Sequence, residues 1–161
     1  MSRVGHATAP CRAAARARWS ERRTGGGAVS GSTEIGPMVA VRAFVDGFNE
    51  DDTDRMQAAC TNETSIIDDF PPHEWRGAGA TTRWYGDMAG MATGYGMSGW
   101  SVTLAEPTEV TVSDRQAYVV VPVDVRWVQA GAPVARTGFM TMALREEVVG
   151  WRISALAWTW T

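Results

Sequence analysis

The spacing of hydrophobic residues changes near Trp100, and this change limits the fold that the chain can adopt. Before Trp100, apolar residues recur at intervals of three or four, which is typical of an α-helix with one buried face. After it, they alternate with polar residues, which is typical of a half-buried strand. In segment 117–129 every odd position from 119 to 127 is apolar, whereas Asp124 and Arg126 hold even positions. The sequence therefore predicts helices followed by a sheet with one core-facing side.

Three helices are expected in the first part of the chain. Pro37 suits the first turn of the first helix, residues 51–53 are candidate caps of the second, and the glycine-rich run 94–99 ends the third. The buried faces are predicted from apolar residues three or four apart: Val41, Phe44, Val45 and Phe48, then Met56, Ala59 and Cys60, then Ala80, Trp84, Met88 and Met91.

The predicted strands begin with 64–70, which Pro71-Pro72 ends, and continue with 101–112, a strand or strand pair that is interrupted at Glu106-Pro107. Further strands are expected at 117–129, 137–145 and 150–161. Turn residues at 131–133 and 146–147 would join these last three into an antiparallel meander. Such a sheet buries its apolar side by wrapping around the helices. We therefore predict an α+β fold with three N-terminal helices packed in a curved, mainly antiparallel sheet.

The 161 residues have room for one domain and a tail. The first 36 residues hold six arginines and two glutamates, whereas residues 37–161 hold nine arginines and 16 acidic residues. We expect a basic, disordered tail at 1–34 and a folded domain at 35–161. A basic tail can bind nucleic acid or an acidic surface, but the lack of lysine and of a repeated basic motif favours an extension without function.

Composition argues against several classes of function. No stretch approaches the roughly 18 consecutive apolar residues of a membrane span, and the start lacks the apolar region of a signal peptide, so a cytoplasmic protein is expected. The acidic domain disfavours nucleic acid as a partner. Cys11 and Cys60 predict neither a disulfide framework nor a metal cluster. No HxH or HxxxH spacing occurs, and no metal or other cofactor is expected.

Four short motifs carry a family resemblance: Phe44-Val45-x-x-Phe48-Asn49, Ser65-Ile66-Ile67-Asp68-Asp69, Trp75-Arg76-Gly77 and Trp84-Tyr85. With the terminal meander, they resemble the NTF2-like superfamily, the cone-shaped fold of ketosteroid isomerase and of SnoaL-type polyketide cyclases. The resemblance covers roughly residues 35–161. Members of this superfamily range from enzymes to binding and assembly modules, so the resemblance implies the fold more strongly than a reaction.

Alignment with the ketosteroid isomerase pattern from Asn49 onward places the general-base aspartate of that family on Asp68. The two oxyanion donors of the family, a tyrosine and an aspartic acid, fall on Phe44 and Met140, which cannot donate a hydrogen bond. Stabilisation of the oxyanion is usually the largest single catalytic effect. Steroid isomerisation is therefore not predicted.

Asp68 is the leading candidate for a general base. In an apolar cavity, desolvation would raise its pKa and make it a better base near neutral pH. Strand alternation sends Asp68 and Asp69 to opposite faces, so we expect at most one of them in the cavity, and the resemblance favours Asp68. The alternative is that one or both cap a turn before Pro71.

Two further residues are candidates for assisting Asp68. His73 lies five positions beyond it, where an Asp-His pair could move protons, or where the histidine could simply occupy the surface of a proline-stiffened loop. Asp87 lies on the inward face of the third helix, either as a second acid of the cavity or as a partner of Arg83.

Large apolar side chains are expected to line the cavity, because the chain has eight tryptophans and four of them fall between 127 and 160. The predicted substrate-binding residues are Phe44, Phe48, Trp75, Trp84, Tyr85, Met88, Val121, Trp127, Met140 and Ile153. Trp158 and Trp160 should project to the side opposite Ile153 and Ala157. Their exposure would mark an interface, so a homodimer through the outer face of the sheet is expected.

These features predict a protein that binds a small hydrophobic organic ligand. If it is an enzyme, cofactor-free acid/base chemistry is expected, of the isomerase, dehydratase, cyclase or hydrolase type, with Asp68 as the base. The alternative is a non-catalytic module for ligand binding or dimerisation, in which the polar residues only orient a ligand.

Overall fold

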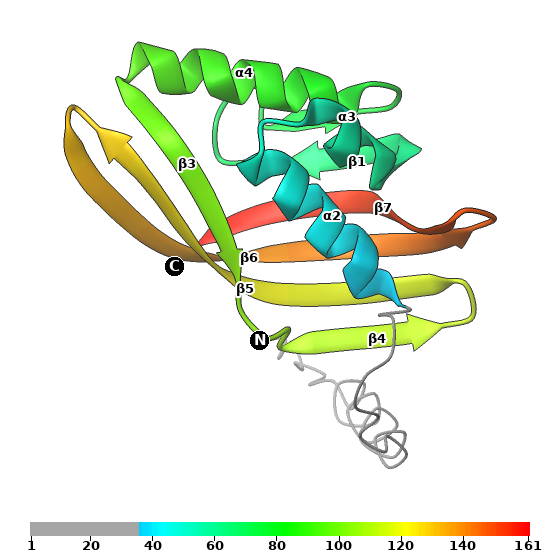
Figure 1. Cartoon of the computed structure of the whole chain (residues 1–161). Helices are drawn as coiled ribbons and strands as arrows, with labels where there is room; N and C mark the ends of the chain where they lie inside the picture. Colours follow the sequence, from blue (N-terminus) through cyan, green and yellow to red (C-terminus); the bar gives the residue numbers. More distant parts are fainter. Residues whose placement is uncertain (1–35) are drawn as a thin grey trace, which may run out of the picture. The chain divides into compact units, whose positions relative to one another are not determined.

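The computed structural model describes residues 36–161, so the basic tail predicted at 1–34 lies outside the described residues. The described residues form three helices and seven strands, which confirms the predicted α+β class with three helices (Figure 1). In chain order the elements are α2 (Pro37–Asn49), α3 (Thr53–Ala58), β1 (Cys60–Ile67), β2 (Glu74–Arg76), α4 (Ala80–Gly94), β3 (Met97–Leu104), β4 (Glu109–Ser113), β5 (Gln116–Gln129), β6 (Ala132–Glu147) and β7 (Gly150–Trp160).

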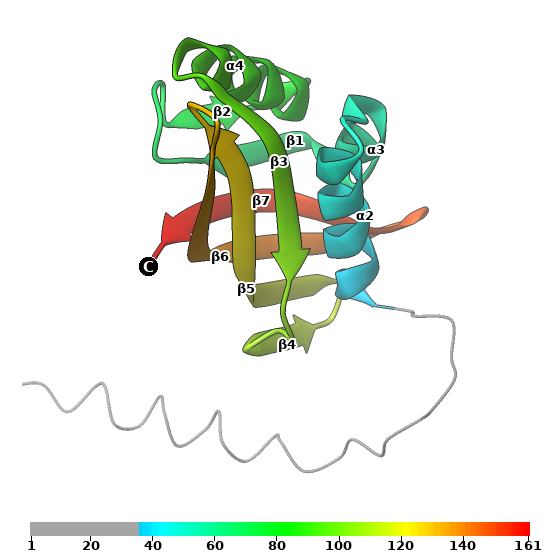
Figure 2. The ribbon, with the colours of Figure 1, turned by 60° about the vertical axis from the view of Figure 1, so that its left-hand side comes forward.

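The strands form one sheet in the order β2-β1-β7-β6-β5-β3, and β4 also pairs with β5. The pairs are antiparallel except for β1 and β7, which are parallel. Figures 1 and 2 show that the long strands β5 and β6 bend along their length, with α2 lying inside the curve of the sheet and α4 across one end. The sheet thus wraps around helices, as its one apolar face requires.

Helix α2 begins at Pro37 and buries the predicted face, in which Val41 and Phe44 are completely inaccessible. At its end, the Asn49 side chain pairs with the backbone of Val102 in β3. Asn49 Nδ2 donates to the carbonyl oxygen of Val102 at 2.9 Å, and the amide of Val102 donates to Asn49 Oδ1 at 2.7 Å. These two bonds attach α2 to β3.

No helix among the described residues is long and apolar enough to span a membrane.

The second predicted helix is shorter than expected. Asp52 caps α3 by accepting a hydrogen bond from the amide of Arg55 at 2.9 Å, but the helix ends at Ala58. Cys60, predicted on a helix, is the first residue of β1 and is buried there. Parallel pairing with β7 extends β1 to four residues before the predicted start, through the polar segment 61–64, in which sequence alternation gives no strand signal.

Strand β7 carries a bulge that reverses the predicted orientation of its tryptophans. Its pairing with β6 passes from Leu144–Ile153 to Ala143–Ala155, which leaves Ser154 as one extra residue. A bulge of this kind shifts the alternation by one position. Ile153 therefore faces the core on one side of the bulge, and Trp158 and Trp160 face the same interior on the other side. The prediction that these two tryptophans are exposed on the outer face is wrong.

A second bulge lies in β3, where two residues lie between Ser98 and Ser101 while β5 has only one between the corresponding partners, Val128 and Arg126. Gly99, with φ of +64°, occupies this irregularity, as glycines within strands often do. The bulge places Trp100 against Trp127 of β5, with ring centroids 4.7 Å apart. Both bulges therefore deliver tryptophan rings to the interior.

Gly138 in β6 makes room for one of these rings. A Cβ atom at this position would lie 2.5 Å from the carbonyl oxygen of Thr159 and 3.4 Å from the ring of Trp160. Gly138 pairs with Trp160 across the two strands. The absence of a side chain at 138 therefore lets β7 approach β6 closely and lets the Trp160 ring lie over the strand.

Candidate active site

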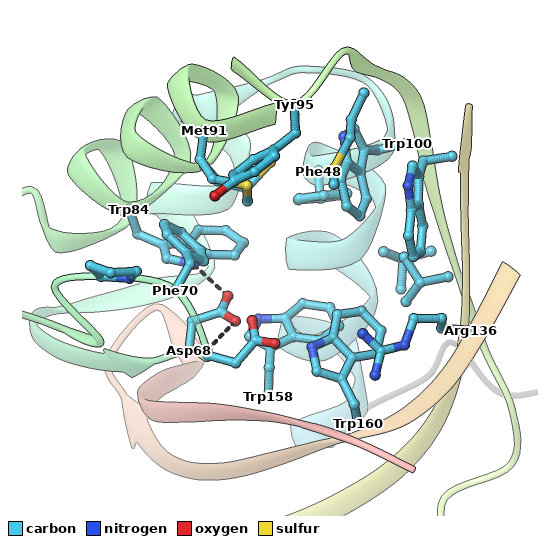
Figure 3. A pocket seen from close by; sticks show the side chains of 17 residues that line it. Phe48, Asp68, Phe70, Trp84, Met91, Tyr95, Trp100, Arg136, Trp158 and Trp160 are labelled. Atoms are coloured by element: carbon cyan, nitrogen blue, oxygen red, sulfur yellow. Dashed lines mark hydrogen bonds between the residues drawn. The ribbon is translucent and has the colours of Figure 1, made fainter. Parts of the chain in front are cut away.

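An aromatic cavity of about 350 Å³, partly open to solvent, lies between α4, the loop after β1 and the inner face of the sheet (Figure 3). Its volume falls at the lower end of the range for small-molecule sites, roughly 300–1,000 Å³. Five of the seven tryptophans in the described residues line it: Trp84, Trp100, Trp127, Trp158 and Trp160. Phenylalanine and methionine side chains add to the wall: Phe48, Phe70, Met88, Met91 and Met97.

Asp68 lies in the cavity wall, directly after the end of β1. Both of its carboxylate oxygens accept hydrogen bonds: Oδ2 from Trp84 Nε1 at 2.9 Å, and Oδ1 from the amide of Asp69 at 2.7 Å. Figure 3 shows the carboxylate beside Trp84, at one end of the cavity. The amide of Asp68 donates to the carbonyl oxygen of His73 at 3.1 Å, which closes the loop that carries the carboxylate. The carboxylate is thus held in one orientation.

Burial among the aromatic rings raises the pKa of Asp68 to about 6, as the sequence predicted for an apolar cavity. The hydrogen bonds from Trp84 and from the amide of Asp69 stabilise the charged form and lower this pKa, and the Asp69 carboxyl raises it again through a side-chain hydrogen bond and, to a smaller extent, its charge. At pH 7 a carboxyl with this pKa is about 90% ionised and has a higher proton affinity than an ordinary aspartate. It is therefore suited to take a proton from a bound molecule.

Asp69 also lines the cavity, so the expectation that at most one of the two aspartates faces it is wrong. Alternation does not apply here because β1 ends at Ile67, before either aspartate. Asp69 is exposed, whereas Asp68 is half-buried. The two carboxylates therefore differ in environment, and Asp68 is the desolvated one.

His73 is exposed and is not among the residues that line the cavity. Its Nδ1 lies 3.2 Å from the main-chain oxygen of Asp68, and not against the carboxylate. Its amide donates to the carbonyl oxygen of Phe70 at 2.9 Å. His73 thus contributes to the shape of the loop, through its backbone above all, and the structure does not bring its imidazole to the acid.

Asp87 is exposed on α4 and lies outside the cavity lining. Its Oδ2 accepts a hydrogen bond from Trp75 Nε1 at 2.8 Å. Arg83, its predicted alternative partner, instead donates to the carbonyl oxygens of Ala78 and Arg76, both at 2.7 Å. Asp87 therefore satisfies the indole of a buried tryptophan behind the cavity.

Four of the ten predicted substrate-binding residues line the cavity: Phe48, Trp84, Met88 and Trp127. Five others are buried in the core and are not part of the cavity wall: Phe44, Trp75, Val121, Met140 and Ile153. The sequence pattern gives the inward face but not which inward residues are covered by others. Phe44, for example, stacks on Trp84 at 5.9 Å between centroids and so lies behind it.

Tyr85, the tenth predicted residue, lines a neighbouring hollow. Its hydroxyl donates a hydrogen bond to the carboxylate of Asp51. Burial, followed by this bond and the Asp51 charge, raises the pKa of Tyr85 to about 12. The hydroxyl is therefore already engaged and remains protonated at neutral pH.

Arg136 is the charged cavity residue that the sequence analysis did not identify. It lies opposite Val125 on the core-facing row of β6, between Val134 and Gly138. The sequence predicts this strand only from residue 137 onward, so Arg136 lies just outside the predicted strand and no inward position is expected for it. Its guanidinium carbon lies 4.7 Å from the centre of the Trp160 ring. The alternation of β6, followed to its actual start, would have shown an arginine in an apolar row.

Four indole nitrogens are buried without a hydrogen-bond partner among the described residues: Nε1 of Trp100, Trp127, Trp158 and Trp160. All four rings line the cavity. An unpaired buried donor costs about 1–3 kcal/mol, and these four nitrogens are themselves inaccessible, so the rings face the cavity while their N–H groups lie within the wall. Phe44 and Met140, the positions of the two oxyanion donors in the ketosteroid isomerase pattern, are fully buried apolar side chains. Among residues 36–161, no cluster of three His, Cys, Asp or Glu could hold a metal ion.

Residues 38–156 match the family model described as a SnoaL-like domain. The chain belongs to this family. The curated proteins include no match to the sequence of this SnoaL-like domain.

Several solved structures share its fold. A ketosteroid isomerase-like protein from Erwinia carotovora atroseptica has 16% identity and a TM-score of 0.60, with 77% of this chain and 92% of that chain covered. An NTF2-like protein with a cystatin-like fold from Novosphingobium aromaticivorans has 17% identity and a TM-score of 0.62, with 90% and 85% covered. An NTF2-like superfamily protein from Salmonella enterica has 19% identity and a TM-score of 0.60, with 76% and 86% covered. At these identities the likeness shows the fold alone, and the fold is NTF2-like.

Proposed function

We propose that this SnoaL-like domain binds a small, largely apolar organic molecule in the tryptophan-lined cavity, and that Asp68 acts on it as a general base. The observation that carries the proposal is the half-buried carboxylate in the cavity wall, with a pKa of about 6. Proton transfer by a positioned side chain contributes about 10²–10⁴ to a reaction rate. The reaction class that fits is cofactor-free isomerisation, dehydration, aldol-type cyclisation or hydrolysis.

The path of the proton starts at an acidic C–H or O–H of the ligand. The Asp68 carboxylate takes this proton, and the negative charge passes to an oxygen or a conjugated system of the ligand. Trp84 Nε1 holds one carboxylate oxygen, and the Asp69 amide holds the other, so the base does not rotate away during the transfer. The aromatic walls restrict water and strengthen the electrostatic interactions within the site.

A compound screen followed by turnover assays tests the proposal. Compounds that raise the Tm of the full chain are tested for turnover with the wild-type protein, because a ligand that binds the native state stabilises it. Asp68→Asn is expected to lower kcat at least 100-fold while the Tm shift persists. Asp87→Asn, which removes an exposed carboxylate outside the cavity, is the matched control and should retain activity.

If the protein is instead a non-catalytic binding module, the same experiment should show binding without turnover. Ligands would stabilise the protein, none would turn over, and Asp68→Asn would change affinity only. Turnover that is unchanged in Asp68→Asn would remove this residue from the mechanism.

We also propose that the protein forms a homodimer through the outer face of the sheet. Trp158 and Trp160 no longer support this, because they face the cavity. The support comes from Tyr118 and Val128 on the outward row of β5, which are 48% and 39% exposed. Light scattering should give a mass near twice 17.4 kDa. Tyr118→Glu should then give a monomer, whereas Val149→Glu in the exposed β6–β7 turn should not.

A further inference from the structure

The inner row of β6 contains one charge among apolar residues. Val134, Gly138, Met140, Met142 and Leu144 share this row with Arg136, since each pairs with an inward residue of β5 or β7. Arg136 is exposed, whereas the row is buried from Gly138 to Leu144. Solvent therefore reaches the Arg136 charge at the end of the row, where the side chain also lines the cavity.

No ion pair or hydrogen bond of Arg136 occurs within the part of the chain that the structure describes. Its contact is with the face of Trp160, at 4.7 Å from the ring centre. A cation over an indole face is attracted by the ring, but this interaction leaves the edge of the guanidinium, with its donors, available. Arg136 thus lies in the cavity wall with donor capacity that nothing described here uses.

The position of Arg136 relative to Asp68 defines two ends of the cavity. Figure 3 shows Asp68 beside Trp84 at one end and Arg136 at the other, with Trp158 and Trp160 between them. Flat indole surfaces favour a flat, conjugated ligand, because offset stacking adds to apolar burial.

We infer that the ligand is a planar aromatic or conjugated anion, whose carboxylate, sulfonate or enolate-type oxygen binds Arg136 while its reactive end lies at Asp68. This inference rests on the proposed function, because it uses the same cavity and the same base. Arginine binds such oxygens with two parallel hydrogen bonds, which fixes orientation as well as affinity. Residues 37–161 have an excess of acidic residues over arginines. An anion therefore enters only because a local cation compensates the repulsion.

Two fluorescent probes with the same aromatic skeleton test the charge preference. 1-Anilinonaphthalene-8-sulfonate carries an anionic group, and N-phenyl-1-naphthylamine lacks it. Each is titrated against the full chain while probe emission and tryptophan quenching are recorded. The sulfonate probe is expected to bind at least tenfold more tightly than the neutral probe. Its affinity should fall as salt is added, because a partly exposed ion pair is screened.

Arg136→Gln should lower the affinity for the sulfonate probe at least tenfold and leave the affinity for the neutral probe within twofold. Arg126→Gln is the matched control, because it removes the same charge from the outward row of β5, at the residue next to Val125, the strand partner of Arg136. It should change neither affinity more than twofold. Near-ultraviolet circular dichroism verifies that both variants are folded.

Equal affinity of the wild type for the two probes, or failure of both to bind, overturns the inference. An equal loss for both probes in Arg136→Gln, or an equal loss of sulfonate binding in Arg126→Gln, also overturns it. The proposed function fails separately, through turnover that persists in Asp68→Asn. The two tests can give different answers. If Arg136→Gln loses the preference for the sulfonate probe while Asp68→Asn keeps full activity, the ligand is an anion but Asp68 is not the base.

Discussion

The indole Nε1 of Trp84 donates a 2.9 Å hydrogen bond to Oδ2 of Asp68, and it does so from within the wall of an aromatic cavity. The bond joins the first half of α4 to the loop after β1. It keeps the carboxylate at the cavity while the surrounding rings remove water from it. Position and proton affinity of the carboxylate therefore come from the same tryptophan-rich environment.

Replacing Trp84 by phenylalanine tests the electrostatic part of this relationship. The N–H of Trp84 stabilises the ionised carboxylate, so its loss should raise the pKa of Asp68 from about 6 to about 7, for a bond worth about 1.4 kcal/mol. Titration of carboxyl carbons by ¹³C NMR measures this. Trp75→Phe is the control, because it removes the indole bond to Asp87 and should leave Asp68 unchanged. An identical Asp68 pKa in wild type and Trp84→Phe would contradict the assigned bond.

The raised pKa of Asp68 should appear in the pH dependence of stability. The folded value of about 6 exceeds the ordinary value of 3.8, so the folded state binds the proton more tightly than the unfolded state. The stabilising contribution is therefore complete below about pH 4 and is lost as the pH rises through 6. Relative to Asp68→Asn, the wild type should lose up to about 3 kcal/mol between pH 4 and 8, and less where solvent reaches the carboxyl.

Urea unfolding at intervals across this pH range measures the difference between the two proteins. Asp87→Asn provides the comparison for an exposed carboxylate. A constant difference between wild type and Asp68→Asn from pH 4 to 8 would show that the carboxyl is not desolvated.

Gly138→Ala should destabilise the protein and disturb the part of the cavity wall that Trp160 forms. The added Cβ would meet the carbonyl oxygen of Thr159 at 2.5 Å, which is backbone and can move only with β7. We expect a loss of about 1–3 kcal/mol, as for other overpacked sites, and a changed emission of Trp160. Gly90→Ala in α4, where a Cβ meets nothing within 4 Å, should instead add about 0.5–1 kcal/mol. Denaturant unfolding of both variants gives the comparison, and equal stability of the two would refute the close approach.

Asn49→Ala should weaken the attachment of α2 to β3. It removes the two bonds to Val102 and leaves the amide and carbonyl of a buried residue unpaired, at a cost of about 2–3 kcal/mol. Asn62→Ala, at an exposed position of β1, is the control and should change stability by less than about 0.5 kcal/mol. A loss for Asn49→Ala as small as that of the control would mean that the two bonds do not hold the helix.

The fold could be predicted from the sequence because periodicity reports burial directly. The alternation in 117–129 places the same residues inward in β5, and the helical spacing around Phe44 and Trp84 marks the buried faces of α2 and α4. Asp68 was found through the family resemblance, with desolvation as the physical reason for its raised pKa. These predictions depend on local pattern or on a motif, and both are visible in one sequence.

The remaining part of the site depends on features that alternation does not reveal. The bulges at Ser154 and Gly99 change the face on which later residues lie, so Trp100, Trp158 and Trp160 were not placed in the cavity. Alternation also does not show why Val121 and Ile153, which face inward, are buried in the core and do not line the cavity. An inward residue lines a cavity only when no other side chain covers it. Gly99 within a strand pattern was the one available signal for a bulge.

The central claim is that the cavity environment of Asp68 turns an ordinary aspartate into a base that works near neutral pH. Assignment of its carboxyl carbon by comparison with Asp68→Asn, followed by an NMR titration of the wild-type protein, measures this directly. The account predicts a midpoint of about 6 for Asp68. A midpoint near 4, the value of a solvated aspartate, would contradict it.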